Sequence, residues 1–173
     1  MSTTSRGPTA HERYREDVAA YVAAGGEETV QRVTTAINGL HKRLGQWYDR
    51  QLVDLGLSQG EWAVLSQLAT CPEGAAMTPT QLADAAGIAP SSMTHRLDRM
   101  SERELVSRST DPANRTRVRV TLTATGWEMF SAAIQESDVV EGDVLKALDP
   151  AQRGQLAVLL ERVIAGFDDV REP

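Results

Sequence analysis

Apolar residues recur at intervals of three and four along most of this chain, a spacing typical of amphipathic helices. The pattern predicts a short helix over residues 12–24 and a long helix over residues 27–55. Ser58 can cap a third helix, because Glu61 stands three residues later and completes a capping box. This third helix is predicted to end near Pro72.

The last third of the chain predicts two more helices with wide apolar stripes. Thr123 can cap the first, and Asp149 followed by Pro150 starts the second with a cap and a proline at the first helical position. The apolar positions are Trp127, Phe130, Ile134, Val140, Val144 and Leu148, then Leu156, Leu159, Leu160, Val163, Ile164 and Phe167. A small domain cannot bury all these stripes alone, so we predict that the terminal helices pack together and against a second copy of the chain. An ordinary helical core within one chain is the alternative.

Between these helical regions the sequence predicts two short helices joined by a tight turn. Thr78 supplies an N-cap, Pro79 occupies the first helical position, and Gln81 completes a capping box. Gly87 ends the first helix where a left-handed backbone is required, and Pro90 opens the second. This arrangement is a helix-turn-helix.

The second of these helices has an apolar side and a polar side. Met93, Leu97 and Met100 share one side at about 100° per residue. The other side carries hydroxyls, an imidazole and guanidiniums, groups that hydrogen-bond base edges or phosphates in the major groove of DNA. These polar residues are Ser91, Ser92, His95, Asp98 and Arg99, with Thr94 and Arg96 on the flanks. For this helix alone, the alternative is a solvated surface face.

A β-hairpin with an arginine-rich loop is predicted to follow. Residues 105–109 form the first strand, and residues 117–122 alternate between polar side chains and valine or leucine, which predicts one exposed and one buried face. Residues 111–114, Asp-Pro-Ala-Asn, have turn chemistry and place Arg115 at the tip, where it can enter a minor groove. An exposed hairpin solubilised by its arginines is the alternative. The order helix, turn, helix and basic hairpin predicts a winged helix-turn-helix.

The charge distribution favours a surface that meets DNA. The whole chain has a net charge of −6. Residues 88–120 hold seven arginines and four carboxylates, a net charge of +3, so the remainder of the chain carries −9. A compact basic region on an acidic body is expected where one face of a protein binds phosphates.

Composition and motifs argue against several other classes. No apolar run approaches the ~20 residues of a membrane span, and the N-terminus lacks the apolar core of a signal peptide, so we expect a cytoplasmic protein. The single Cys71 excludes an internal disulfide and a cysteine-based zinc site, and we expect it to be an inert thiol rather than a redox switch. The histidines, His11, His41 and His95, are too dispersed for a metal site. No catalytic motif is present, so no metal, cofactor or enzymatic activity is expected.

These motifs resemble the MarR-type transcriptional regulators over residues 30–167. The strongest are GLSQGEWAVL at 56–65, TPTQLADAAGI at 78–88, SSMTHRLDRM at 91–100, ELVSR at 104–108 and DPANRTRVRVTLTATG at 111–126. The resemblance implies a mainly α fold with a small β-hairpin wing and an obligate-type homodimer joined through its first and last helices. It places the recognition helix at residues 90–103 and the wing at residues 111–118. The family wing usually has aspartate followed by two arginines, where this chain has Asn114, Arg115 and Thr116.

The combined prediction is a dimeric regulator, expected to act as a repressor, that binds double-stranded DNA at a pseudo-palindrome with half-sites about 10 bp apart. Expected major-groove contacts are Ser91, Ser92, Thr94, His95 and Arg99, and expected wing contacts are Arg115 and Arg117. The expected organisation is a disordered segment (1–11), dimerisation helices (12–56), a DNA-binding lobe (57–122) and further dimerisation helices (123–173). The alternative is a dimeric ligand-sensing or protein-interaction module that does not bind DNA.

The predicted helix at residues 12–24 is absent from smaller family members and resembles the branch of urate-responsive regulators. That branch binds its ligand with two arginines, a tryptophan in the added helix, and an aspartate directly after the tryptophan that corresponds to Trp62. Arg96 and Arg108 match the two arginines, but the added helix has no tryptophan and Ala63 replaces the aspartate. These departures argue against urate. They leave a different small anionic or aromatic effector as the expected ligand, with Trp62, Arg96 and Arg108 as candidate contacts.

Overall fold

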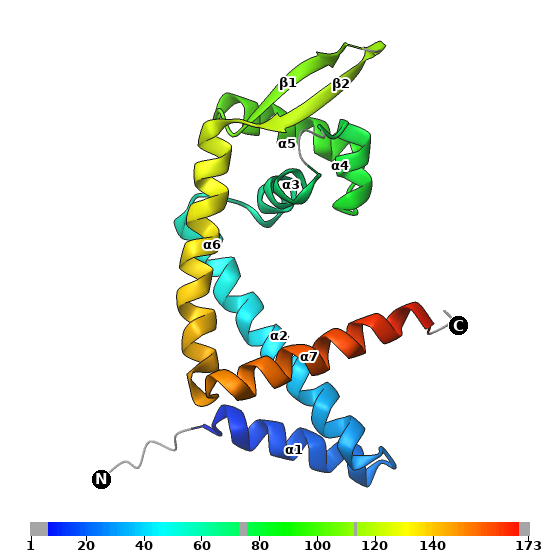
Figure 1. Ribbon diagram of the computed structural model, residues 1–173, viewed down its shortest axis with the longest axis vertical. Coiled ribbons are helices and arrows are strands. Elements are labelled where there is room, and N and C mark those ends of the chain that lie inside the picture. Colours follow the sequence, from blue (N-terminus) through cyan, green and yellow to red (C-terminus); the bar gives the residue numbers. More distant parts are fainter. Residues whose placement is uncertain (1–6, 73–75, 113, 170–173) are drawn as a thin grey trace. The chain divides into compact units, whose positions relative to one another are not determined.

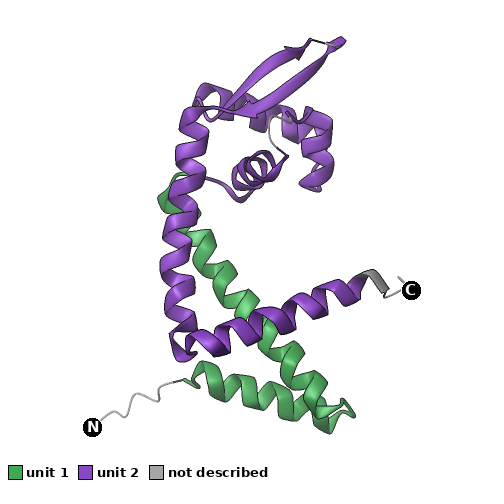
Figure 2. Cartoon of the chain, viewed as in Figure 1, with its two compact units in different colours: residues 1–56 green, residues 57–173 purple. Residues whose placement is uncertain are grey.

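The computed structural model describes residues 7–72, 76–112 and 114–169. The chain divides into two compact units, residues 1–56 and residues 57–173 (Figure 2). Helices dominate both units, and a two-stranded antiparallel sheet lies in the second (Figure 1). The prediction of a mainly α chain with a β-hairpin is confirmed.

The first unit is a pair of helices, α1 (Ala10–Ala23) and α2 (Glu28–Asp54). Gly25 takes a φ of +102° between them, a conformation in which a side chain would be strained. The Tyr14 hydroxyl donates a hydrogen bond to the Arg32 carbonyl oxygen at 3.3 Å. This bond ties α1 to the second turn of α2.

The N-terminal helix begins earlier than the hydrophobic pattern indicates. The Thr9 hydroxyl accepts a hydrogen bond from the Glu12 backbone N–H at 3.2 Å and caps α1, so the helix begins at Ala10 rather than at Glu12. The expected disorder over residues 1–11 is therefore wrong for residues 10 and 11. Residues 1–6 of that segment lie outside the described residues.

The second unit begins with three helices, α3 (Gln59–Thr70), α4 (Pro79–Ala85) and α5 (Pro90–Glu102). The predicted capping boxes start α3 and α4, and Gly87 takes a φ of +62° after α4. The predicted apolar side of α5 is fully buried. The largest side chains of this core are Val64, Leu65, Leu82, Met93, Leu97, Met100, Leu105 and Val120.

A hairpin of β1 (Val106–Asp111) and β2 (Asn114–Leu122) extends from the end of this helical lobe (Figure 1). The strands pair antiparallel from Val106 with Leu122 to Thr110 with Val118, and the register shifts beyond Thr110. Met77 forms an isolated antiparallel bridge to β2 at the base of the hairpin.

The predicted alternation of buried and exposed residues holds only at the base of the hairpin. Val120 is fully buried against the core, whereas Val118 is 42% exposed. The prediction that Val118 faces a closed core is wrong, because the strands continue past the end of the helical lobe (Figure 1). The outer half of the hairpin is therefore accessible on both faces.

The second unit continues with helices that begin at the predicted caps, Thr123 and Asp149. Their order is α6 (Ala124–Val144), the 3-10 helix η1 (Leu145–Ala147), α7 (Pro150–Ala165) and the 3-10 helix η2 (Gly166–Asp169). η1 interrupts the predicted stripe, so Leu148 lies outside α6. The wide stripe of the last helix stays exposed in the single chain, notably at Leu159, Leu160, Val163, Ile164 and Phe167.

Candidate nucleic-acid interface

The polar side of α5 faces solvent over its whole length. Ser91, Ser92, Thr94, His95 and Arg99, the residues expected to meet a major groove, are all exposed. Ala89 is the N-cap and has no side chain that could accept from the first turn. The free backbone N–H groups of that turn therefore remain available, and a helix N-terminus with free N–H groups favours phosphate.

Thr94 lies at the edge of this polar side and also makes a bond within its own helix. Its hydroxyl donates to the Pro90 carbonyl oxygen at 3.1 Å. In this rotamer the hydroxyl proton is occupied, so Thr94 offers only oxygen lone pairs to a partner.

Arg108 on β1 joins the hairpin to α5. Its guanidinium pairs with the Asp98 carboxylate at 2.8 Å and donates to the Thr94 carbonyl oxygen at 3.4 Å. The Arg108 side chain is 29% exposed and the Asp98 side chain 50%, so solvent screens part of this pair. These two contacts of the Arg108 guanidinium hold β1 against α5.

The tip of the hairpin is shaped by the residues that depart from the family pattern. The Asn114 side-chain oxygen accepts hydrogen bonds from the Thr116 backbone N–H at 3.1 Å and the Thr116 hydroxyl at 2.6 Å. These bonds close a small turn around Arg115. Arg115 and Arg117 are both exposed, as a contact with DNA requires.

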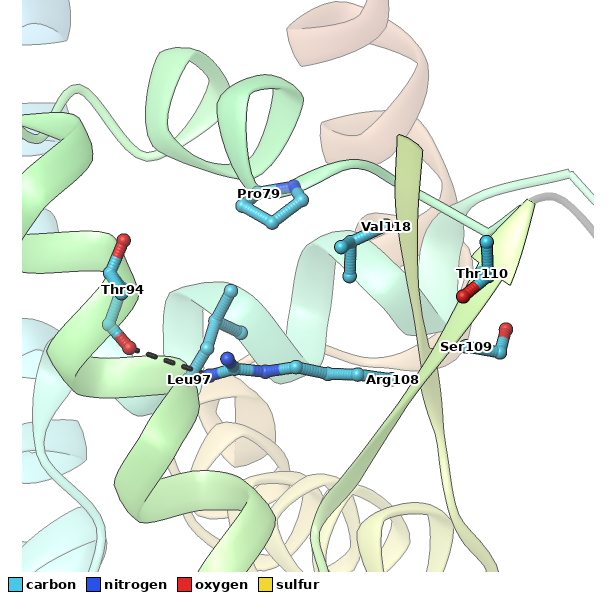
Figure 3. A pocket seen from close by; sticks show the side chains of 7 residues that line it. All are labelled: Pro79, Thr94, Leu97, Arg108, Ser109, Thr110 and Val118. Carbon is cyan, nitrogen blue, oxygen red and sulfur yellow. Dashed lines mark hydrogen bonds between the residues drawn. The ribbon is translucent and has the colours of Figure 1, made fainter. Parts of the chain in front are cut away.

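A cavity of about 430 Å³ lies between α5, the start of α4 and the hairpin (Figure 3). Its lining combines apolar side chains with the Arg108 guanidinium. The lining residues are Pro79, Thr94, Leu97, Arg108, Ser109, Thr110 and Val118. Val118, which is half exposed, therefore forms one wall of a pocket instead of part of a closed core.

Trp62 and Arg96, two of the three candidate effector contacts, are not among the residues that line this cavity. Only Arg108 faces the pocket of Figure 3. Trp62 stacks on Phe130 with ring centroids 5.4 Å apart and an interplanar angle of 13°. Arg96 lies against Gly60, where an added Cβ would stand 2.3 Å from the Arg96 Cζ. Among the described residues, Arg96 Nε and Nη1 are buried without a hydrogen-bond partner.

Glu61 is a buried carboxylate, and the sequence predicted for it only the role of closing a capping box. Burial raises the pKa of Glu61, but hydrogen bonds from Ser58 and the positive charges of Arg103 and Arg99 outweigh it. The pKa of Glu61 therefore lies below the ordinary value of 4.5. This carboxylate is ionised at neutral pH and acts on two arginines of the α5 region.

Across residues 7–72, 76–112 and 114–169, no three histidine, cysteine or acidic side chains gather as metal ligands would. In the same part of the chain, no helix combines the length and apolarity needed to cross a membrane.

A helix-turn-helix and a basic hairpin that share one core define the class of winged helix-turn-helix proteins. The model of the MarR family matches residues 57–118, which span α3 to the outer part of β2. Over residues 57–118 the chain is thus similar to the MarR family.

Known relatives agree with this family. The transcriptional regulator PecS of Dickeya dadantii (strain 3937) is 29% identical over 107 residues, which cover 62% of this chain and 64% of PecS. The match thus spans less than two thirds of that relative.

Solved structures share the fold. The S. aureus regulator MepR is 16% identical with a TM-score of 0.66, and the match covers 78% of this chain and 97% of MepR. A mutant of E. coli MarR is 22% identical with a TM-score of 0.63, covering 75% and 93% of the two chains. A mutant of S. aureus MepR, solved bound to an oligodeoxyribonucleotide, is 17% identical with a TM-score of 0.60 and covers 78% of this chain and 97% of its own.

Proposed function

We propose that this protein is a cytoplasmic, dimeric transcriptional repressor that binds a specific DNA sequence and is released by a small effector. The observation that carries the proposal is the joint exposure of the α5 polar side and the arginines of the hairpin on one lobe. The fold and the family support it, because recognition helix and wing form a two-groove reader in this class.

In this proposal α5 enters the major groove. Ser91 and Ser92, in its first turn, bond phosphate or base edges with their hydroxyls and backbone N–H groups. His95 and Arg99 follow on the exposed side, and an arginine there can make a bidentate contact with guanine. Thr94 contributes a hydroxyl acceptor and a methyl group from the edge of the helix.

The hairpin then lies over the adjacent minor groove. Arg115 is held by the Asn114–Thr116 turn at the tip, where an arginine gains from the negative potential of a narrow A·T-rich groove. Arg117 supplies a second positive charge nearer the lobe.

The proposal of a dimer rests on apolar side chains that are exposed to solvent in the single chain. On α7, Ile164 is 66% exposed and Phe167 is 68% exposed, and Val30 and Val33 on α2 are about half exposed. Burying apolar area stabilises association by roughly 25 cal/mol per Å² before the costs of binding. A two-fold dimer presents two lobes to half-sites about 10 bp apart.

The effector is proposed to be a small anion or aromatic acid that enters the pocket of Figure 3. An anionic group there competes with Asp98 for Arg108 and changes how the hairpin is held on α5. Binding lowers DNA affinity only if the effector prefers the geometry that does not fit DNA.

Replacing Arg115 with alanine should weaken DNA binding about tenfold or more per dimer, the scale of one lost arginine contact in each lobe. The slope of log Kd against log salt should also become shallower, because fewer counterions are released. Fluorescence anisotropy with the duplex DNA upstream of the protein's own gene measures both.

Arg13→Ala is the matched control, since Arg13 is an exposed arginine on α1 and its loss changes the net charge equally. It should leave both affinity and slope nearly unchanged. If the two variants bind alike, the hairpin has no part in recognition.

A further inference from the structure

The capping boxes of this chain differ in the residue at the third helical position. Glutamine closes the box of α4 (Gln81) and of α7 (Gln152), whereas glutamate closes the box of α1 (Glu12) and of α3 (Glu61). A neutral amide is thus sufficient to cap a helix in this protein. The charge of a buried glutamate therefore needs another explanation.

Glu61 divides its two oxygens between two tasks. Oε2 accepts from the Ser58 backbone N–H at 2.8 Å and from the Ser58 hydroxyl at 2.7 Å, which completes the cap of α3. Oε1 receives the Arg103 guanidinium at 3.3 Å. The Glu61 side chain is only 7% exposed and the Arg103 side chain 37%, so water screens the pair from the arginine side alone.

Arg103 is the C-cap residue of α5. Its pair with Glu61 therefore connects the first turn of α3 to the end of the proposed recognition helix. Arg99, one turn earlier on α5, also lies close enough for its charge to favour the ionised form of Glu61. One carboxylate thus acts on Arg99 in the last turn of α5 and on Arg103 at its C-cap.

We propose that Glu61 is a positioning residue for DNA recognition: it holds Arg103, fixes the end of α5 on the lobe and offsets positive charge beside Arg99. The inference rests on the proposed function. Without Glu61, Arg103 is a free cation next to the DNA-facing side, which strengthens sequence-independent attraction to phosphates. The C-terminal end of α5 is then held less firmly, which weakens the contacts with bases that depend on how the helix is placed on the DNA.

Glu61→Gln tests this inference, because glutamine preserves the shape and, as at positions 81 and 152, can preserve the cap. Affinity is measured by anisotropy for the DNA upstream of the protein's own gene and for a shuffled duplex of equal length. The ratio of the two affinities should fall roughly tenfold, the scale of one lost charged contact. Affinity for the shuffled duplex should hold or rise, and its salt slope should steepen.

Glu12→Gln is the matched control, since it makes the same change at the same cap position of α1 on an exposed side chain. It should leave the ratio unchanged. Arg103→Gln removes the pair from the other side, and the double variant should be no worse than Glu61→Gln alone, as expected for two residues acting as a unit. Arg103→Gln also keeps the proposal testable if Glu61→Gln does not fold.

The dependence of the melting temperature on acid pH in Glu61→Gln is an independent test of the Glu61–Arg103 ion pair. Since the folded pKa lies below 4.5, the carboxylate stabilises the fold above its unfolded pKa, and the stabilisation is lost as pH falls through the folded pKa. Melting temperature should therefore decline less steeply with acid in Glu61→Gln than in the unmodified protein.

An unchanged affinity ratio in folded Glu61→Gln, or in folded Arg103→Gln, would overturn the inference and leave the proposed function intact. Absence of DNA binding by the unmodified protein would overturn both.

Discussion

Replacing Gly126 with alanine should strongly destabilise the lobe that carries the proposed recognition helix, although alanine favours a helix more than glycine does. Gly126 lies in the first turn of α6, where the backbone crosses close to the start of β1. An added Cβ would stand 2.1 Å from the Leu105 carbonyl oxygen and 3.2 Å from Leu122 Cδ2. The nearest atom belongs to the backbone, so the clash cannot be relieved by a side-chain rotation.

The Gly126 site is further constrained by the capping of α6. Thr123 caps α6 by accepting from the Gly126 N–H at 3.0 Å, while its own backbone N–H donates to the Leu105 oxygen at 3.2 Å. Moving α6 away from Leu105 would break these bonds. We therefore expect a loss of about 3 kcal/mol or more, in the range of severe overpacking.

Gly142→Ala is the control, because Gly142 lies in the same helix and an added Cβ there meets nothing within 4 Å. This change should stabilise the protein by about 0.5–1 kcal/mol through helix propensity. Urea unfolding monitored by circular dichroism compares the two. Equal stabilities would mean that α6 does not approach Leu105 as closely as described.

Replacing Ile164 with glutamate should convert the proposed dimer to monomers. DNA affinity should fall by a factor of about 10²–10⁴, because loss of the second lobe removes the high effective concentration that a two-site contact provides. Ile164 on α7 is 66% exposed in the single chain, so a charge there costs the isolated fold little. In a dimer that buries the α7 stripe, the same charge is desolvated without a partner.

Light scattering after size-exclusion chromatography reports the change from the mass of two chains to the mass of one. Ala165→Glu is the control, since Ala165 is exposed on a different side of α7 at about 100° per residue. It should leave the mass of two chains unchanged. If the unmodified protein has the mass of one chain, the apolar stripe of α7 is not a dimer interface.

The features predicted best from sequence are those determined by neighbours along the chain. The caps at Ser58, Thr78, Thr123 and Asp149 and the left-handed Gly87 each depend on residues at most a few positions apart. Local chemistry of this kind starts and ends helices in the same way in most contexts. The buried side of α5 also follows from helical periodicity alone.

The features that sequence did not predict depend on residues distant in the chain. The pairs of Arg103 with Glu61 and of Arg108 with Asp98 require the folded positions of α3, α5 and β1. Val118 fits an alternating pattern, yet it lies beyond the core that would have buried it. Periodicity gives the face of a strand but not how far the neighbouring helices extend.

The central claim is that the chain is a dimeric reader of a specific DNA sequence. The most direct measurement incubates the purified protein with fragments of its own genome, sequences those retained, and titrates one of them at several salt concentrations. We expect retained fragments to share a pseudo-palindrome with half-sites about 10 bp apart, two chains per site, and affinity that falls steeply with salt. If a folded dimer retains no fragment above random DNA even at low salt, the claim is contradicted, and a sensing module without DNA affinity becomes the better account.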